Sequence, residues 1–318
     1  MSAAAPAADL DALLPAHLEG WGPERAVRDA AGEIEARGHV RRLAAKHYEN
    51  FPVASVVLPR RLAPHFHAVY AFCRWADDLG DEVPGADASL VLLAWWRDLT
   101  EALFAGDPPR HPVFITLGPT VGEFDLTAGP FLDLISAFEQ DQTVAGYATF
   151  ADLRDYCRRS ADPVGRIVLK LLEASDEQNV RLSDDVCTGL QLINMWQDVA
   201  RDADLGRRYL PAADMERFGY AIGDWEDRRD VPAFRDLMRF QVDRAEGLLR
   251  SGRPLADRLG GRFGATIDLF AAGGLAVCGK LRAIDFDVWR VRPTVTKVDA
   301  AKLLAGALAR SAGRAVRQ

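Results

Sequence analysis

Residues 68–82 read AVYAFCRWADDLGDE, and residues 191–202 read QLINMWQDVARD. Both segments are apolar at most positions, and polar side chains interrupt them every three or four residues. In an α-helix, positions i, i+4, i+7 and i+11 lie on one narrow face. We therefore interpret each segment as a helix that is buried on most sides and carries one polar line.

The two polar lines have a similar order of side chains, with an arginine or amide one turn before a pair of aspartates. The members of the first line are Tyr70, Arg74, Asp77 and Asp81. The members of the second line are Gln191, Asn194, Asp198 and Asp202. Aspartates four residues apart repel each other even in water, and burial increases that penalty. Arg74 and Arg201 are the cations that the sequence places nearby, and two cations are too few for these carboxylates together with Asp78 and Glu82.

Divalent cations would supply the missing positive charge. Aspartate oxygens suit Mg²⁺, which keeps several waters and bridges carboxylates to substrate phosphates. If the two lines face each other across a cavity, they would hold a diphosphate between them through shared metal ions. The alternative is that both lines are solvated helix faces. A zinc or di-iron site is disfavoured, because the nearest histidines, His65 and His67, do not have the Glu-x-x-His spacing.

The composition is that of a globular protein. Hydrophobic residues make up 49% and charged residues 27% of the 318 residues, which is too apolar for a disordered chain. The 39 basic and 46 acidic side chains give a net charge of −7, and this sign disfavours a nucleic-acid-binding protein.

Helical periodicity dominates the chain, whereas alternating β-branched runs are nearly absent. The expected helices span about residues 24–47, 62–81, 87–105, 130–141, 150–158, 163–174, 181–203, 232–250, 254–284 and 295–312. The expected loops include residues 106–112, 118–129 and 205–231. Because no linker divides the chain, we expect an all-α fold with one domain over residues 1–318, in which residues 1–23 are loosely ordered.

The cysteines and the apolar runs indicate the compartment. Four cysteines lie far apart, and none forms a CxxC pair, so we expect reduced and mostly buried thiols in a cytoplasmic protein. No run approaches the roughly 18 apolar residues of a membrane span. The N-terminus also lacks the basic segment and apolar core of a signal peptide.

Four segments resemble the squalene/phytoene synthase family. They are residues 47–55 (HYENFPVAS), 68–82, 156–165 (YCRRSADPVG) and 191–211, the last of which ends in GRRYLP. The resemblance extends from about residue 40 to about residue 310. It implies an isoprenoid synthase-type helical bundle around a central cavity, in which metal-bound prenyl diphosphates react.

The resemblance also implies roles for individual residues. Five of them are implied ligands of Mg²⁺, namely Asp77, Asp81, Asn194, Asp198 and Asp202. The implied substrate-binding residues are Phe51, Arg74, Gln191, Asn194, Arg207 and Tyr209. The implied catalytic residues are the four aspartates with Tyr70 and Arg74. Phe51 would belong to an apolar cavity wall, since aromatic faces stabilise carbocations.

Within the family, the sequence is most similar to the bacterial branch that converts presqualene diphosphate to hydroxysqualene in hopanoid-type squalene biosynthesis. Condensing members of the family usually carry serines near positions 48 and 50, where this chain has Tyr48 and Asn50. A glycine-rich dinucleotide loop that would bind NADPH is not evident. A tyrosine is common near position 286, where this chain has Phe286.

Two other functions remain open at this point. The chain could be a head-to-head condensing synthase that makes presqualene diphosphate, squalene or a phytoene-type product from two prenyl diphosphates, or a non-catalytic assembly or lipid-binding protein on the same scaffold. Retention of all four aspartates disfavours the non-catalytic alternative. A long lipid substrate would bring the protein into peripheral contact with the membrane and couple it to other enzymes of squalene synthesis.

Overall fold

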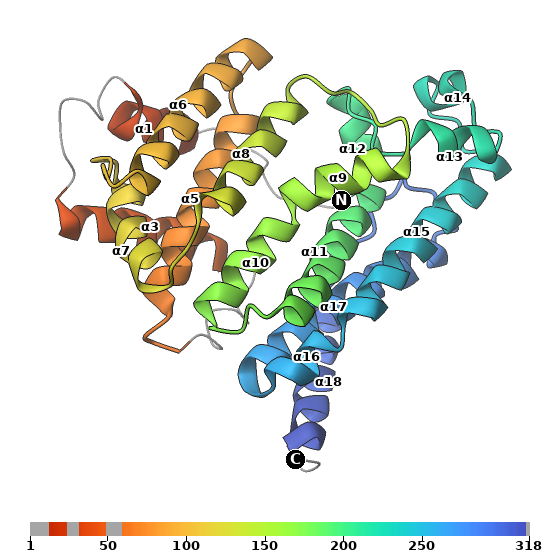
Figure 1. The fold of residues 1–318 in the computed structure, drawn as a ribbon. Helices are drawn as coiled ribbons and strands as arrows, with labels where there is room; N and C mark the ends of the chain where they lie inside the picture. The colour runs from red at the N-terminus through yellow and green to blue at the C-terminus, as the bar shows by residue number, and fades with distance from the viewer. Residues whose placement is uncertain (1–12, 24–31, 49–58, 316–318) are drawn as a thin grey trace, which may run out of the picture. The chain divides into compact units, whose positions relative to one another are not determined.

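The computed structural model describes residues 13–23, 32–48 and 59–315 (Figure 1). Within these ranges, regular structure is helical, and pairing of extended backbone is limited to one bridge between Gly146 and Arg208. The prediction of an all-α fold is therefore confirmed. The chain divides into two compact units, Met1–Thr143 and Val144–Gln318, which we describe one at a time. The single domain over residues 1–318 stays a prediction.

The first unit contains the helices that Figure 1 colours from red to yellow-green. Their bounds are α1 Leu13–Trp21, α3 Glu33–Tyr48, α5 Ala63–Asp81, α6 Ala86–Phe104, α7 Pro112–Glu123 and α8 Ala128–Asp141. Helix α5 packs against α3, α6, α7 and α8, so most of its surface is covered. The core around α5 is aromatic. Trp75 stacks on Trp96 with ring centroids 5.4 Å apart, and Phe72 meets Phe131 edge to face at 4.9 Å.

Two segments of the first unit differ from the sequence prediction. Residues 13–21, expected to be loosely ordered, form α1, whose His17 stacks on Trp75 at a centroid distance of 5.5 Å. Residues 118–123, expected to be a loop, continue helix α7. The interior Pro119 removes one helical hydrogen bond, but Val113, Phe114 and Leu117 are fully buried, and their packing outweighs that loss.

A histidine cluster lies beside this aromatic core. His39 is 6% exposed and its Nε2 accepts a hydrogen bond from Trp75 Nε1 at 3.3 Å. Burial lowers the pKa of His39 to about 4, and the neighbouring His17 and Arg42 act in the same direction. Burial also lowers the pKa of His111, which is 1% exposed and contacts the Trp75 ring.

We expect the protein to lose stability as the pH falls from about 6.5 to about 4. His39 stays neutral in the folded chain over this range but binds a proton in the unfolded chain, so acid favours unfolding. The pKa difference corresponds to about 3 kcal/mol at the acid end. Urea unfolding at several pH values would measure it. His39→Gln keeps an acceptor for Trp75 without titrating, and an unchanged pH slope in this variant would contradict the assignment to His39.

The second unit contains the helices that Figure 1 colours from yellow-green to blue. Their bounds are α9 Phe150–Ser160, α10 Asp162–Leu171, α11 Glu177–Gln197, α12 Val199–Asp204, α13 Ala212–Arg217, α14 Ile222–Glu226, α15 Pro232–Gly252, α16 Leu255–Leu259, α17 Gly261–Ala283 and α18 Lys297–Ala315. Helix α11 is central, because α9, α10, α15, α16 and α17 all pack against it.

The start of α10 is set by two features of the sequence. Pro163 stands in the first turn, where its missing N–H removes no helical hydrogen bond. Asp162 is fully buried and accepts hydrogen bonds from Arg154 at 2.8 Å and Thr188 at 2.7 Å, which link α10 to α9 and α11. A Cβ atom on Gly165 would lie 2.3 Å from Ser183 Oγ, so α10 and α11 approach closely only because this residue is glycine.

The expected helix over residues 181–203 is interrupted, and the expected loop over 205–231 is partly helical. Asp198 (φ −103°, ψ 14°) separates α11 from α12. Residues 205–231 contain α13 and α14. The start of α13 is held by two backbone hydrogen bonds, from Ala212 N to Tyr147 O and from Ala213 N to Ala148 O, each 2.9 Å long. These partners lie more than sixty residues away, so the local sequence does not reveal them.

Helix α17 is long and apolar enough to cross a membrane by length and composition, although charged residues interrupt it. It packs against α11, α15, α16 and α18 within the second unit. Its Asp268 is fully buried and accepts hydrogen bonds from Arg253 at 2.8 Å and from Arg310 of α18 at 2.6 Å. A buried carboxylate paired with two arginines is typical of a helix inside a protein core.

All four cysteines are free thiols, as predicted. Cys157 and Cys278 are buried, whereas Cys73 and Cys187 are partly exposed. Burial raises the pKa of each thiol to about 12, so these cysteines stay protonated and unreactive near neutral pH.

Candidate active site

The first polar line lies on α5, as predicted. Apart from Cys73, the residues between its members are buried, among them Ala71, Phe72 and Trp75. Tyr70, Arg74 and Asp77 are partly exposed, and Asp81, the last residue of the helix, is exposed. The polar line is therefore the accessible side of an otherwise covered helix.

Arg74 is the centre of an ion-pair network on this helix. Its guanidinium donates to Asp77 at 3.0 Å and to Glu82 at 2.7 Å, and it forms a third, short contact with Asp78. The Arg74 side chain is 15% exposed, so these interactions are only weakly screened by solvent. Three carboxylates on one arginine leave a local excess of negative charge.

Burial, reinforced by the neighbouring carboxylates, changes the protonation of two groups beside Arg74. Burial raises the pKa of Asp78 to about 8; Arg74 opposes this shift, while Glu82 and Asp77 reinforce it. Burial also raises the pKa of Tyr70 well above its usual value, so the phenol keeps its proton and remains a hydrogen-bond donor. Asp77 is the carboxylate of this group that keeps substantial access to solvent, since 42% of its side chain is exposed.

The second polar line starts on α11 and ends on α12. Gln191 and Asn194 lie on α11, Asp198 is the junction residue, and Asp202 lies on α12. Hydrogen bonds from Asp198 N to Asn194 O (3.0 Å) and from Asp202 N to Asp198 O (2.8 Å) keep the helical spacing across the junction.

Exposure varies along this second line. Asn194 is exposed, Gln191 and Asp202 are partly exposed, and Asp198 is 7% exposed.

Arg292 is a site residue that sequence reasoning missed. Its guanidinium binds both carboxylate oxygens of Asp198, through a short contact from Nε and a 3.0 Å hydrogen bond from Nη2. Asp202 adds to the negative potential, and together these aspartates raise the pKa of Arg292, with the hydrogen bond to Asp198 as the largest cause. The expectation that Arg74 and Arg201 are the available cations is therefore wrong for this line. No local signal could reveal a partner 94 positions away.

Arg207 and Tyr209 follow α12 directly. The backbone N–H of Arg207 donates to Asp202 O at 2.8 Å, which holds the start of this segment against the end of the polar line. The ring of Tyr209 lies 6.0 Å from that of Tyr147 and 5.9 Å from that of Tyr156. The structure therefore holds Arg207 at the end of the second line and places Tyr209 against two tyrosines of the second unit.

The remaining substrate-binding prediction, Phe51, lies outside the described residues, as does Asn50. The roles of the candidate residues on both lines stay predictions, and so does the expectation that the lines face each other. Phe286 is buried, with 2% of its surface exposed, so this position contributes an apolar ring to the second unit.

The family model for squalene/phytoene synthase matches residues 44–299. The chain belongs to the squalene/phytoene synthase family. The match covers both polar lines and Arg292, and the family is one of prenyl diphosphate enzymes.

Relatives of this chain within the family are named for different reactions. The chain is 31% identical over 275 residues to a hydroxysqualene synthase of Sinorhizobium fredii. The aligned region covers 85% of this chain and 91% of that synthase. It is also 31% identical over 218 residues to a phytoene synthase of Arthrospira platensis, spanning 64% and 70%. Among solved structures, the squalene synthase HpnC from Alicyclobacillus acidocaldarius aligns with a TM-score of 0.75 and 42% identity, over 79% of this chain and 94% of the other. These likenesses identify the fold as the helical isoprenoid synthase fold.

Proposed function

We propose that this protein converts presqualene diphosphate to hydroxysqualene. The observation that carries the proposal is that both aspartate pairs are complete, on α5 and across the α11–α12 junction, in a chain similar to a hydroxysqualene synthase and to the squalene synthase HpnC. Tyr48 and Asn50, which replace the serines usual in condensing relatives, favour this reaction over condensation.

The reaction balances without a reductant. The C–O bond to the diphosphate breaks, and the diphosphate leaves with the electron pair. The cyclopropylcarbinyl cation rearranges, a water oxygen forms the new C–O bond, and that water loses a proton. A squalene product would instead need a hydride donor, and no dinucleotide-binding loop is evident in the sequence.

Aspartate and asparagine oxygens are donors that suit a magnesium-bound diphosphate. Among the residues that the structure describes, no three acidic, histidine or cysteine side chains are grouped closely enough to form a complete metal site. Mg²⁺ needs only one or two protein carboxylates when waters and substrate phosphates complete its shell. Asp77, Asp81, Asn194, Asp198 and Asp202 would hold the metal ions. When bound, the ions would neutralise the charge that develops on the leaving diphosphate.

The other residues bind and orient the substrate. Arg74 is held by Asp78 and Glu82, so its guanidinium remains fixed beside Asp77. We assign to Arg74, Arg207 and Tyr209 the task of contacting the diphosphate oxygens, because charged and phenolic donors stabilise the leaving group more as its charge grows. Tyr70 keeps its proton and adds a further donor on α5.

A condensing synthase is the second candidate function. The likeness to a phytoene synthase favours it. That relative and the hydroxysqualene synthase of Sinorhizobium fredii are each 31% identical to this chain over the aligned residues. Such an enzyme would consume farnesyl diphosphate or a longer prenyl diphosphate directly.

Product analysis separates the two functions. Purified protein is incubated with Mg²⁺ and either presqualene diphosphate or farnesyl diphosphate alone, in water enriched in oxygen-18. We expect hydroxysqualene that carries the heavy oxygen from presqualene diphosphate, no product from farnesyl diphosphate, and no turnover after chelation of the metal. Turnover of farnesyl diphosphate alone would establish the condensing function instead. A product without the label would contradict capture of the cation by water.

A further inference from the structure

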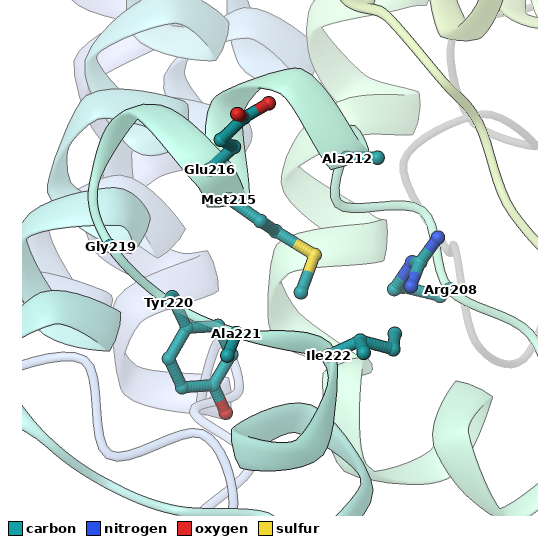
Figure 2. A pocket seen from close by; sticks show the side chains of 8 residues that line it. All are labelled: Arg208, Ala212, Met215, Glu216, Gly219, Tyr220, Ala221 and Ile222. Carbon is teal, nitrogen blue, oxygen red and sulfur yellow. The ribbon is translucent and has the colours of Figure 1, made fainter.

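An open pocket of about 360 Å³ lies in the second unit, in the region of α13 and α14 (Figure 2). It is lined by residues from the segment before α13, from α13 itself, from the connection between α13 and α14, and from the start of α14. The volume lies within the usual range of small-molecule sites. The candidate active-site residues are not among those that line it.

The walls of this pocket are mainly apolar. Met215 extends into the space between the two segments, and Ile222 reaches toward it from the opposite side (Figure 2). Tyr220 also lines the pocket, but it is 1% exposed, its ring packs against Phe234 at a centroid distance of 5.0 Å, and its hydroxyl donates to the backbone oxygen of Asp224 (3.0 Å). Ile222 is 50% exposed, which leaves an apolar side chain for a ligand to cover.

Arg208 supplies the positive charge of the pocket, and Glu216 is the acidic residue that lines it, with its carboxylate directed away from the space beside Met215 (Figure 2). Its Nε atom is buried and has no hydrogen-bond partner among the described residues. A buried N–H without an acceptor is unfavourable, and the missing acceptor is most effective when it is an anion. Burial lowers the pKa of Arg208, while Glu226 opposes that shift, and an arginine remains charged at neutral pH in either case.

The backbone around Arg208 fixes where its side chain can lie. Arg208 N donates to Ala145 O at 2.8 Å, next to the bridge between Gly146 and Arg208. A Cβ atom on Gly146 would lie 3.0 Å from Nη2 and 3.3 Å from Nε of Arg208. The absence of a side chain at position 146 therefore makes room for the guanidinium at the pocket.

We propose that this pocket binds an amphipathic anion, whose head pairs with the Arg208 guanidinium and whose apolar chain lies against Met215 and Ile222. The occupant is a small dissolved molecule with a phosphate or carboxylate head, because the pocket joins one buried donor to an apolar wall. The site is separate from the two aspartate pairs and needs no metal ion. It therefore does not depend on the proposed function.

Calorimetric titration of the full chain in EDTA tests this proposal. Chelation removes metal-mediated binding of phosphate at the aspartate pairs. The probes are octyl phosphate, octanol and inorganic phosphate, which separate the head group from the chain. We expect saturable binding of octyl phosphate at one site and at least about tenfold weaker binding of the other two, because each lacks half of the contacts.

Matched variants locate the site. Arg208→Gln is expected to weaken octyl phosphate binding by about tenfold or more, since it removes the charged donor. Gly146→Ala is expected to weaken binding while the charge is unchanged, because it displaces the guanidinium. Arg262→Gln removes an exposed arginine that does not line the pocket and is expected to bind as the parent does. Circular dichroism and thermal melting confirm that each variant is folded.

Several results would overturn the proposal. They are undetectable binding of octyl phosphate, equal binding of octanol or inorganic phosphate, and equal affinity in the folded Arg208→Gln variant. Binding to phosphatidic acid vesicles that depends on Arg208, without binding of dissolved octyl phosphate, would also overturn it, because the site would then recognise a lipid surface.

Discussion

Replacement of Asp77 or Asp202 by asparagine is expected to lower turnover by about 10²–10³-fold, because each substitution removes a charged oxygen that would hold the metal-bound diphosphate. Folding should be retained in both variants. After Asp77→Asn, Arg74 keeps its contacts with Asp78 and Glu82, and after Asp202→Asn, Arg292 keeps Asp198. The measurement is the initial rate of diphosphate release as a function of Mg²⁺ concentration.

A matched control separates a local effect from a general effect of lost charge. Asp107→Asn removes an exposed carboxylate after α6 and is expected to leave the rate unchanged. Parental turnover in the Asp77→Asn and Asp202→Asn variants would contradict the assignment of these aspartates to the metal-bound diphosphate.

The double variant tests whether the two polar lines act on the same substrate. If Asp77 and Asp202 hold one diphosphate together, the second substitution should lower the turnover rate by a much smaller factor than it does alone. The interaction that the two residues share is already lost after the first substitution. Two independent sites would give a rate reduction equal to the product of the single effects. Multiplicative loss would therefore contradict the prediction that the lines face each other.

Asp268→Asn is expected to reduce the free energy of unfolding by about 3–5 kcal/mol, because breaking a buried charge network leaves its partners unpaired. Asp268 is fully buried, and its carboxylate joins Arg253 to Arg310 of α18. Burial opposes ionisation of this carboxyl, but the hydrogen bonds from both arginines lower its pKa overall. Equilibrium urea unfolding, followed by circular dichroism, measures the difference.

The pH dependence identifies the cause of that loss. The lowered pKa stabilises the folded chain above the unfolded pKa of about 4, and this contribution disappears as the pH falls through the folded value. The difference between parent and variant should therefore shrink in acid. Asp243→Asn on α15 removes an exposed carboxylate paired with Arg282 and should change stability by less than about 0.5 kcal/mol. A similar loss of unfolding free energy in Asp268→Asn and Asp243→Asn would contradict the role of burial.

The helices that carry the polar lines could be predicted because their pattern is local. An apolar run interrupted at helical spacing specifies both the helix and its accessible side, and α5 shows this arrangement. The same reasoning failed for α7. There Gly118 and Pro119 suggest a loop, but the burial of Phe114 and Leu117 decides the structure. Local propensity is a weak term when neighbouring helices cover one face.

The charge environment of the candidate site could be predicted only in part. The sequence reveals the excess of carboxylates and places Arg74 one turn before them. It does not reveal that Arg292 binds Asp198, because a long side chain can pair with any residue that the fold brings within reach. It also does not reveal the unpartnered Nε of Arg208, since satisfaction of a donor depends on every surrounding atom.

The amino-acid sequence by itself determined the all-α fold, the family motifs and the two aspartate pairs, because these depend on residue type and on spacing along a helix. Tertiary structure decided which carboxylates are buried, which arginines neutralise them, and where a pocket remains beside Arg208. Those properties arise from contacts between segments that are distant along the chain, and the energy of burying a charge depends on its complete surroundings.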